Sequence, residues 1–273
     1  MTKLLIAGDW HGNWVWAKKI IDVAVAEDID KIIQVGDFGV WPGAEGKEYL
    51  LILSRYLVKK SKKLGRPVRL YFLPGNHEDY NQINQWMINI EPNEDGHREI
   101  EPHLFYTGKV NSWVWDNKTY GVVGGAVSID RKYRKLNESW WADEVLSPEE
   151  REDAKNLGKV DYLFSHDCPT MHPFNFLINH LDSTIHRQYM TEIALELRPE
   201  VWFHGHYHYY AQYSFYHGGG STQVYSLDAD VRATQSPSLQ RHAAVLDTDL
   251  ELVYSIDKQF EWFGQRFYFD KER

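Results

Sequence analysis

The feature that most constrains this chain is a series of short apolar segments, each followed at once by polar residues of the kinds that bind metal ions. The first segment, Lys3–Ala7, runs into Gly8-Asp9-Trp10-His11-Gly12. Four later segments end in the same manner, before Gly36-Asp37, Gly75-Asn76-His77, His166 and Gly205-His206-Tyr207-His208. A short apolar run bounded by glycine is typical of a buried β-strand. The pattern therefore predicts several buried strands with polar groups at their carboxyl ends.

The segments between the first three strands have a helical pattern. Residues 13–27 place Trp16, Ile20 and Val23 on one recurring face, and residues 47–64 end in a lysine cluster followed by Gly65. A strand–helix–strand–helix–strand order predicts a mostly parallel sheet with right-handed crossovers. In such sheets the functional crevice lies beyond the carboxyl ends of the strands, where the polar residues stand.

In the remainder of the chain the predicted strands and helices follow one another in a less regular order. Residues 110–115 and 119–123 flank a turn and predict an antiparallel hairpin, and Ser147-Pro148-Glu149-Glu150 is a capping box that predicts a helix start. Further strands are expected at 162–165, 201–203, 211–216, 223–226, 243–246 and 252–256, with a helix at 181–197 and a loop at 124–143. We predict a single α/β domain over residues 1–273, with two sheets and helices outside them.

Composition excludes several classes of protein. No apolar run approaches the roughly 20 residues of a membrane helix, so a cytoplasmic location without membrane contact is expected. One cysteine, Cys168, excludes a disulfide framework, and we expect it to be buried and inert. The formal net charge of −9 argues against nonspecific binding of nucleic acid.

The strand-end residues favour a particular metal chemistry. Carboxylate, imidazole and amide oxygen, without thiolate, suit hard-to-borderline divalent ions. Seven such side chains are too many for one tetrahedral ion but suit two ions that share a carboxylate. Two ions about 3.5–4 Å apart form a clamp for in-line displacement at phosphorus and activate a water between them.

These five ordered motifs resemble those of the calcineurin-like metallophosphoesterases. The resemblance implies an α/β fold, a four-layer αββα sandwich of two mixed sheets flanked by helices, and metal-dependent hydrolysis of a phosphate ester. It also implies two divalent ions, with Mn²⁺ as first choice and Fe, Zn²⁺, Mg²⁺ or Ni²⁺ as alternatives. In the implied roles Asp9, His11 and His208 bind one metal, Asn76, His166 and His206 bind the other, Asp37 bridges them, and His77 is the general acid and transition-state stabiliser.

The second motif departs from that of the family's protein phosphatases. Those enzymes carry Gly-Asp-x-x-Asp-Arg-Gly, whereas Val40 and Trp41 replace the aspartate and arginine here. A phosphorylated small molecule or nucleotide is therefore slightly favoured as substrate, as a phosphodiester or a phosphomonoester, and a phosphoprotein is the alternative. As a hypothesis, Arg131 or Arg134 replaces the missing arginine at the substrate phosphate. Neither Glu78 nor Asp79 is identified from sequence as the group that orients His77.

Two more distant functions stay open, an inactive binding scaffold and a nuclease. No predicted ligand is missing, which opposes the scaffold, and the acidic charge opposes the nuclease. His204 is expected to support the site or the core. The remaining histidines are expected on loops or the surface, and these are His97, His103, His172, His180, His186, His217 and His242.

Overall fold

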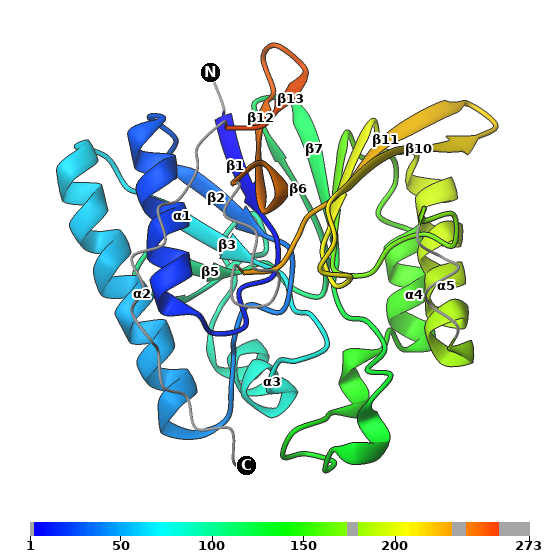
Figure 1. The fold of residues 1–273 in the computed structure, drawn as a ribbon, viewed down its shortest axis with the longest axis horizontal. Coiled ribbons are helices and arrows are strands. Elements are labelled where there is room, and N and C mark those ends of the chain that lie inside the picture. Colours follow the sequence, from blue (N-terminus) through cyan, green and yellow to red (C-terminus); the bar gives the residue numbers. More distant parts are fainter. Residues whose placement is uncertain (1–2, 174–179, 231–238, 257–273) are drawn as a thin grey trace.

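The computed structural model describes residues 3–173, 180–230 and 239–256. Its two β-sheets face each other and carry helices on their outer sides, so that the molecule has four layers (Figure 1). This arrangement confirms the predicted αββα fold class. That residues 1–273 form one domain stays a prediction. No helix in the described ranges is long and apolar enough to cross a membrane.

The first sheet has seven strands in the order β13-β12-β1-β2-β3-β5-β4. Strands β1, β2, β3 and β5 run parallel, and the other three pair antiparallel. The strands are β1 (Lys3–Ala7), β2 (Lys31–Gln34), β3 (Arg69–Phe72), β4 (Arg98–Glu101), β5 (Leu104–Tyr106), β12 (Ala243–Asp247) and β13 (Leu252–Tyr254). Its helices are α1 (Trp14–Ala26), α2 (Gly43–Leu64) and α3 (Tyr80–Asn89).

The second sheet has six strands in the order β10-β11-β9-β8-β7-β6, of which β7, β8, β9 and β11 run parallel. The strands are β6 (Val110–Trp115), β7 (Lys118–Val123), β8 (Tyr162–Ser165), β9 (Val201–His204), β10 (Ala211–His217) and β11 (Gly220–Ser226). Its outer face is covered by α4 (Pro148–Lys155) and α5 (Leu181–Leu197), as Figure 1 shows. Helix α4 begins with the predicted capping box at Ser147.

The core explains why the central strands are apolar throughout. Along β1, Leu5 and Ala7 pack toward α1 and α2, while Leu4 and Ile6 pack between the two sheets. Because successive side chains of a strand point to opposite faces, a strand covered on both sides reads as one continuous apolar run. The carboxyl ends of these strands are thereby fixed at a common edge of the sandwich.

Several elements escaped the sequence analysis. Helix α3, which Asp79 caps by accepting from the backbone of Asn81 and Gln82, is rich in asparagine and glutamine, and its buried residues are Tyr80 and Ile83. Strand β4 has charged residues at three of its four positions and β5 has only three residues, so neither shows an apolar run of the usual strand length. Inside the predicted loop 124–143 lies a short 3₁₀ helix at Arg131–Tyr133.

Four histidines that were expected on loops or the surface are buried: His97, His172, His186 and His242. Three of them are in loops as expected, whereas His186 lies in α5, so the expectation was wrong for His186. His97 is representative, because its ring lies 4.5 Å from that of Trp113 and 5.1 Å from that of Tyr71. Burial lowers the pKa of His97 to about 4. An imidazole thus serves as a neutral aromatic side chain in the core, which periodicity cannot reveal.

Candidate metal centre

Polar groups from both sheets meet where the parallel strands end. The loops that follow β1, β2 and β3 supply Asp9, His11, Asp37, Asn76 and His77, and those after β8 and β9 supply His166, His206 and His208. The structure brings all seven predicted ligands into two adjoining groups, with His77 beside them. That these residues bind metal stays a prediction.

The first group consists of Asp9, His11, Asp37 and His208, with one ligand atom of each within 4.8 Å of the others. Nε2 of His208 lies 3.3 Å from a carboxylate oxygen of Asp9. Nε2 of His11 lies 3.5 Å from Oδ2 of Asp37. Oxygen and imidazole donors at this separation suit one divalent ion.

The second group consists of Asp37, His166 and His206, again with ligand atoms within 4.8 Å. Oδ1 of Asn76 lies 3.1 Å from Nε2 of His166, and Oδ1 of Asp37 lies 3.4 Å from the same nitrogen. Asp37 therefore presents Oδ2 to the first group and Oδ1 to the second. A carboxylate placed in this manner can bridge two ions.

The backbone is shaped around these side chains. A Cβ at Gly75 would collide with the Asp37 carboxylate, and a Cβ at Gly205 would collide with that of Asp9. Only glycine fits at such close approaches. Asp37, His206 and His208 have positive φ angles of 50°, 71° and 49°, a conformation that costs non-glycine residues energy and gathers at functional sites. The side chains of the candidate site are therefore positioned by a strained local backbone.

The carboxylates and imidazoles of the site shift one another's pKa values. Burial alone would raise the pKa of Asp37, but His166 and His77 hold it well below its ordinary value. Burial alone would lower the pKa of His166, but Asp37 and Asp9 raise it to about 10. Burial and the neighbouring His166 lower the pKa of His206 to about 4. Divalent ions would replace the proton on His166, since a ligating imidazole is neutral.

Hydrogen bonds from outside the site orient several of the ligands. Nδ1 of His166 donates to the carbonyl of Val35, 2.9 Å away, which leaves the lone pair of Nε2 for the predicted metal contact. The amide of Asn76 donates to Ser128 Oγ at 2.9 Å, and this hydroxyl donates to Glu144 at 2.7 Å. Burial raises the pKa of Glu144 to about 7, against the hydrogen bonds from Ser128.

His11 has a comparable neighbour that the sequence analysis also missed. Its Nδ1 lies 3.4 Å from Oδ2 of Asp230, whose other oxygen accepts from the side-chain amide of Asn13 at 3.0 Å. Asp230 is more than two hundred residues away along the chain, and Ser128 and Glu144 lie in or just after the predicted loop. No sequence pattern marks any of the three.

His77 has an unexpected neighbour in Arg134. Nη1 of Arg134 lies 2.7 Å from Nδ1 of His77, and Nη2 lies 3.3 Å from Nε2. Asp130 holds the guanidinium from the other side at 2.8 Å. Burial lowers the pKa of His77, Asp37 opposes this, and Arg134 lowers it further. The orienting group that sequence could not identify is therefore Arg134.

The two acidic residues after His77 face elsewhere. Glu78 accepts from the backbone N–H groups of Gly39 and Gly75, and Asp79 caps α3. Arg131, the other arginine proposed for the substrate phosphate, forms an ion pair with Asp182 at 2.5 Å. The structure thus separates the two arginines: one contacts His77, and the other is engaged on the surface.

A groove adjoins the site at Gly12, the residue after His11. It has a volume of about 310 Å³ and is lined by Trp14, Trp41, Glu45, Glu48, Tyr49 and Ile52 together with Gly12. The ring of Trp41 occupies the space that a Cβ at Gly12 would need. The tryptophan that replaces the protein phosphatases' arginine is therefore a wall of this groove.

Comparison with known families identifies the class of protein. The sequence model of the calcineurin-like phosphoesterase family matches residues 2–210, about three quarters of the chain. The chain belongs to this family and is a metal-dependent phosphoesterase, which hydrolyses phosphate esters. Among curated proteins, none was found to match the sequence.

Solved structures share the fold at low sequence identity. The protein TT1561 of Thermus thermophilus is 12% identical with a TM-score of 0.54, and the match covers 94% of this chain and 98% of that one. GAP50, described as the anchor in the inner membrane complex of Plasmodium, is 10% identical with a TM-score of 0.50, covering 96% and 91%. These likenesses support the fold alone.

Proposed function

We propose that the protein hydrolyses a phosphorylated small molecule, slightly favouring a nucleotide-type substrate, at two divalent ions held by the two groups. The observation that carries this proposal is the position of Asp37. Its two carboxylate oxygens face His11 on one side and His166 on the other, at 3.5 and 3.4 Å. The donor set fits two ions, because it combines carboxylate oxygens with imidazoles, and Gly75 and Gly205 let the backbone approach the carboxylates of Asp37 and Asp9 closely.

Two bound divalent ions would supply an activated water and neutralise charge on the phosphoryl oxygens. The chain's own contribution centres on His77. Guanidinium donors lie 2.7 Å from Nδ1 and 3.3 Å from Nε2, and with Nδ1 accepting the shorter bond the proton of the neutral ring would lie on Nε2. Nε2 is 3.9 Å from Asp37, so it faces the shared carboxylate. From there it can donate to the leaving oxygen of a phosphate ester, a contribution typically worth about 10²–10⁴-fold.

The groove supports the preference for a nucleotide. A flat, apolar base could pack against Trp41 and Trp14 while its phosphate lies by His11. Stacking of a base on an aromatic side chain is worth about 1–3 kcal/mol. The exposed carboxylates of Glu45 and Glu48 at the rim would accept hydrogen bonds from amino or hydroxyl groups and repel further phosphates.

Manganese is the proposed resident metal, because carboxylate, imidazole and amide ligands without thiolate accommodate it well. Fe, Zn²⁺, Mg²⁺ and Ni²⁺ are the alternatives to compare with it. A cytoplasmic location also stays a prediction.

The test is a substrate panel with the metal-reconstituted protein. Bis-p-nitrophenyl phosphate, p-nitrophenyl phosphate, nucleoside monophosphates, cyclic nucleotides and a phosphopeptide would be compared for kcat/KM under each metal. Asp37→Asn is expected to lose metal and activity together, whereas His77→Asn is expected to keep two ions and lose about 10²–10⁴-fold in rate. Preferred turnover of the phosphopeptide would favour the alternative, a phosphoprotein phosphatase. Full activity of His77→Asn on every substrate would refute the role of His77.

A further inference from the structure

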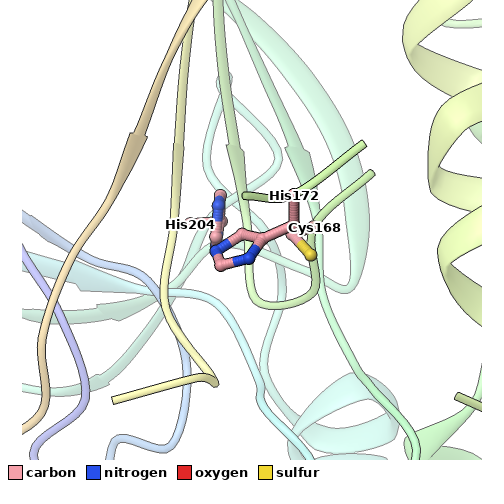
Figure 2. A group of neighbouring side chains, drawn as sticks. All are labelled: Cys168, His172 and His204. Carbon is pink, nitrogen blue, oxygen red and sulfur yellow. The ribbon is translucent and has the colours of Figure 1, made fainter. Parts of the chain in front are cut away.

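A further cluster of side chains that could bind a metal ion lies outside the metal centre described above. Cys168, His172 and His204 are all buried, and one ligand atom of each lies within 4.8 Å of the others. Figure 2 shows the three side chains gathered together. Unlike the first two groups, this one contains a sulfur atom and no carboxylate.

This cluster of three side chains lies on the face of the second sheet that α5 covers. His204 follows Trp202 by two residues on β9, and Trp202 packs in the cluster between this sheet and α5. Phe203, the residue between them, packs between the two sheets instead. Because alternate residues of a strand share a face, His204 points to the α5 side. It therefore lies on the opposite face from the inter-sheet core.

The same two strand ends thus serve two sites. After β8 come His166, a predicted ligand of the metal centre, and then Cys168. At the end of β9 come His204 and then His206, again one for each site. The i and i+2 spacing separates the two sets without a long connection.

The orientation of His204 is that of a metal ligand. Its Nδ1 lies 3.1 Å from the carbonyl of Gly205 and donates to it, so the lone pair of the neutral ring is on Nε2. Ligating histidines commonly donate their other nitrogen to a backbone carbonyl, as His166 does to Val35 in the first site. Nε2 now accepts from the hydroxyl of Tyr213 at 3.1 Å, and an ion at Nε2 would take the place of this hydrogen bond.

We propose that Cys168, His172 and His204 bind one zinc ion, separate from the two ions of the phosphoesterase centre. One thiolate and two imidazoles are a zinc ligand set, with Zn–S of about 2.3 Å and Zn–N of about 2.0–2.1 Å. Donors now within 4.8 Å of one another would need to close by up to about 1.4 Å around a tetrahedral ion.

Binding replaces a proton by the ion. The thiol of Cys168 loses its proton to solvent, and a zinc–sulfur bond forms without any change of oxidation state. The buried carboxylate of Asp167 is next to this cysteine and accepts from its backbone N–H at 2.8 Å. The same carboxylate accepts from the hydroxyl of Tyr207 at 2.6 Å and lies 2.7 Å from Nδ1 of His186. The ion would pin the segment around His172 to the end of β9, behind His206.

The test uses cobalt, because Co²⁺ occupies zinc sites and its thiolate complexes absorb by sulfur-to-metal charge transfer. The full-length protein would be stripped with a chelator and titrated with Co²⁺ under anaerobic conditions, with bound metal counted by mass spectrometry. We expect three ions per chain and a thiolate band that added Zn²⁺ bleaches. The phosphoesterase centre contains no thiolate, so the band reports Cys168 alone.

Matched variants separate the two centres. Cys168→Ser should bind two ions, lose the band and keep phosphoesterase activity. Asp37→Asn should lose ions from the phosphoesterase centre and keep the band, so failure of one proposal is distinguishable from failure of the other. Two ions and no thiolate band in the wild-type protein would overturn the zinc site, and that measurement needs no variant to fold. Loss of the band in Asp37→Asn would show that the two centres are not separate.

Discussion

Replacing Arg134 by alanine tests how His77 is held. In the structure the guanidinium donates to the His77 ring at 2.7 Å and is itself held by Asp130 at 2.8 Å. Alanine removes the donors and leaves Nδ1 without the partner that places the ring proton on Nε2. A positioning role predicts that the general-acid contribution of His77 falls while substrate binding changes little.

The expected size follows from the lost contact. A hydrogen bond from a charged donor contributes about 1.5–3 kcal/mol. At about 1.4 kcal/mol for each factor of ten, kcat should fall by about 10–100-fold. This is less than the loss expected for His77→Asn, since the imidazole itself remains.

The assay is a comparison of leaving groups. A p-nitrophenolate leaves with little proton donation, whereas an alkoxide needs it. Arg134→Ala should therefore slow an alkyl phosphate ester more than p-nitrophenyl phosphate. Its pH profile should also move, because removal of the guanidinium charge raises the pKa of His77. Arg131→Ala is the matched control, since Arg131 is paired with Asp182 on the surface.

Two outcomes would refute this reasoning. An equal fall for both leaving groups, with a raised KM, would make Arg134 the phosphate-binding arginine instead. A similar loss in Arg131→Ala would show that the contact to His77 has no special effect. Arg134→Lys helps to distinguish positioning of His77 from binding of the phosphate, because lysine keeps the positive charge but not the planar guanidinium with its paired donors.

Three further predictions concern other parts of the chain. Ser128→Ala should lower the affinity for the ion at Asn76 about 10–100-fold, because Asn76 loses its orienting hydroxyl. Metal titration should show an unchanged affinity for the ion at the first group. Trp41→Ala should raise KM about tenfold for a nucleoside monophosphate but not for glycerol phosphate; equal effects would exclude base stacking. The contribution of His97 to the unfolding free energy should fall by up to about 3 kcal/mol as pH drops from about 6.5 to about 4, because the unfolded chain protonates His97 first. Denaturant unfolding at several pH values should show a smaller loss of unfolding free energy in His97→Phe than in the wild type. The same pH dependence in both proteins would contradict the burial of a neutral His97 ring.

Much of the fold follows from local sequence. The strand β1 is apolar on both faces because it lies between helices and a second sheet, and that double burial is visible as an unbroken apolar run. Elements without such a signal, such as the polar helix α3, were missed. Local patterns report burial, and α3 buries little besides Tyr80 and Ile83.

The candidate ligands could be picked out of the sequence because their motifs follow strands directly. Asp9 and Asp37 each come two or three residues after a buried strand, so the fold itself brings them together. Their neighbours could not be found this way. Arg134 reaches His77 from a loop 57 residues away, and Asp230 reaches His11 across 219 residues. Such contacts depend on where distant loops lie in the folded chain, and no local sequence pattern specifies this.

The sequence by itself determined the family, the sandwich and the residues that gather at one edge of its sheets, because strand order and strand ends are local properties repeated in a fixed order. Only the tertiary structure decided that Arg134 rather than Glu78 contacts His77, and that Cys168 faces His172 and His204. Side-chain direction at the end of a strand alternates with every residue, and the partner on each side comes from a distant segment. Packing of those segments, rather than any spacing in the chain, therefore decides which groups meet.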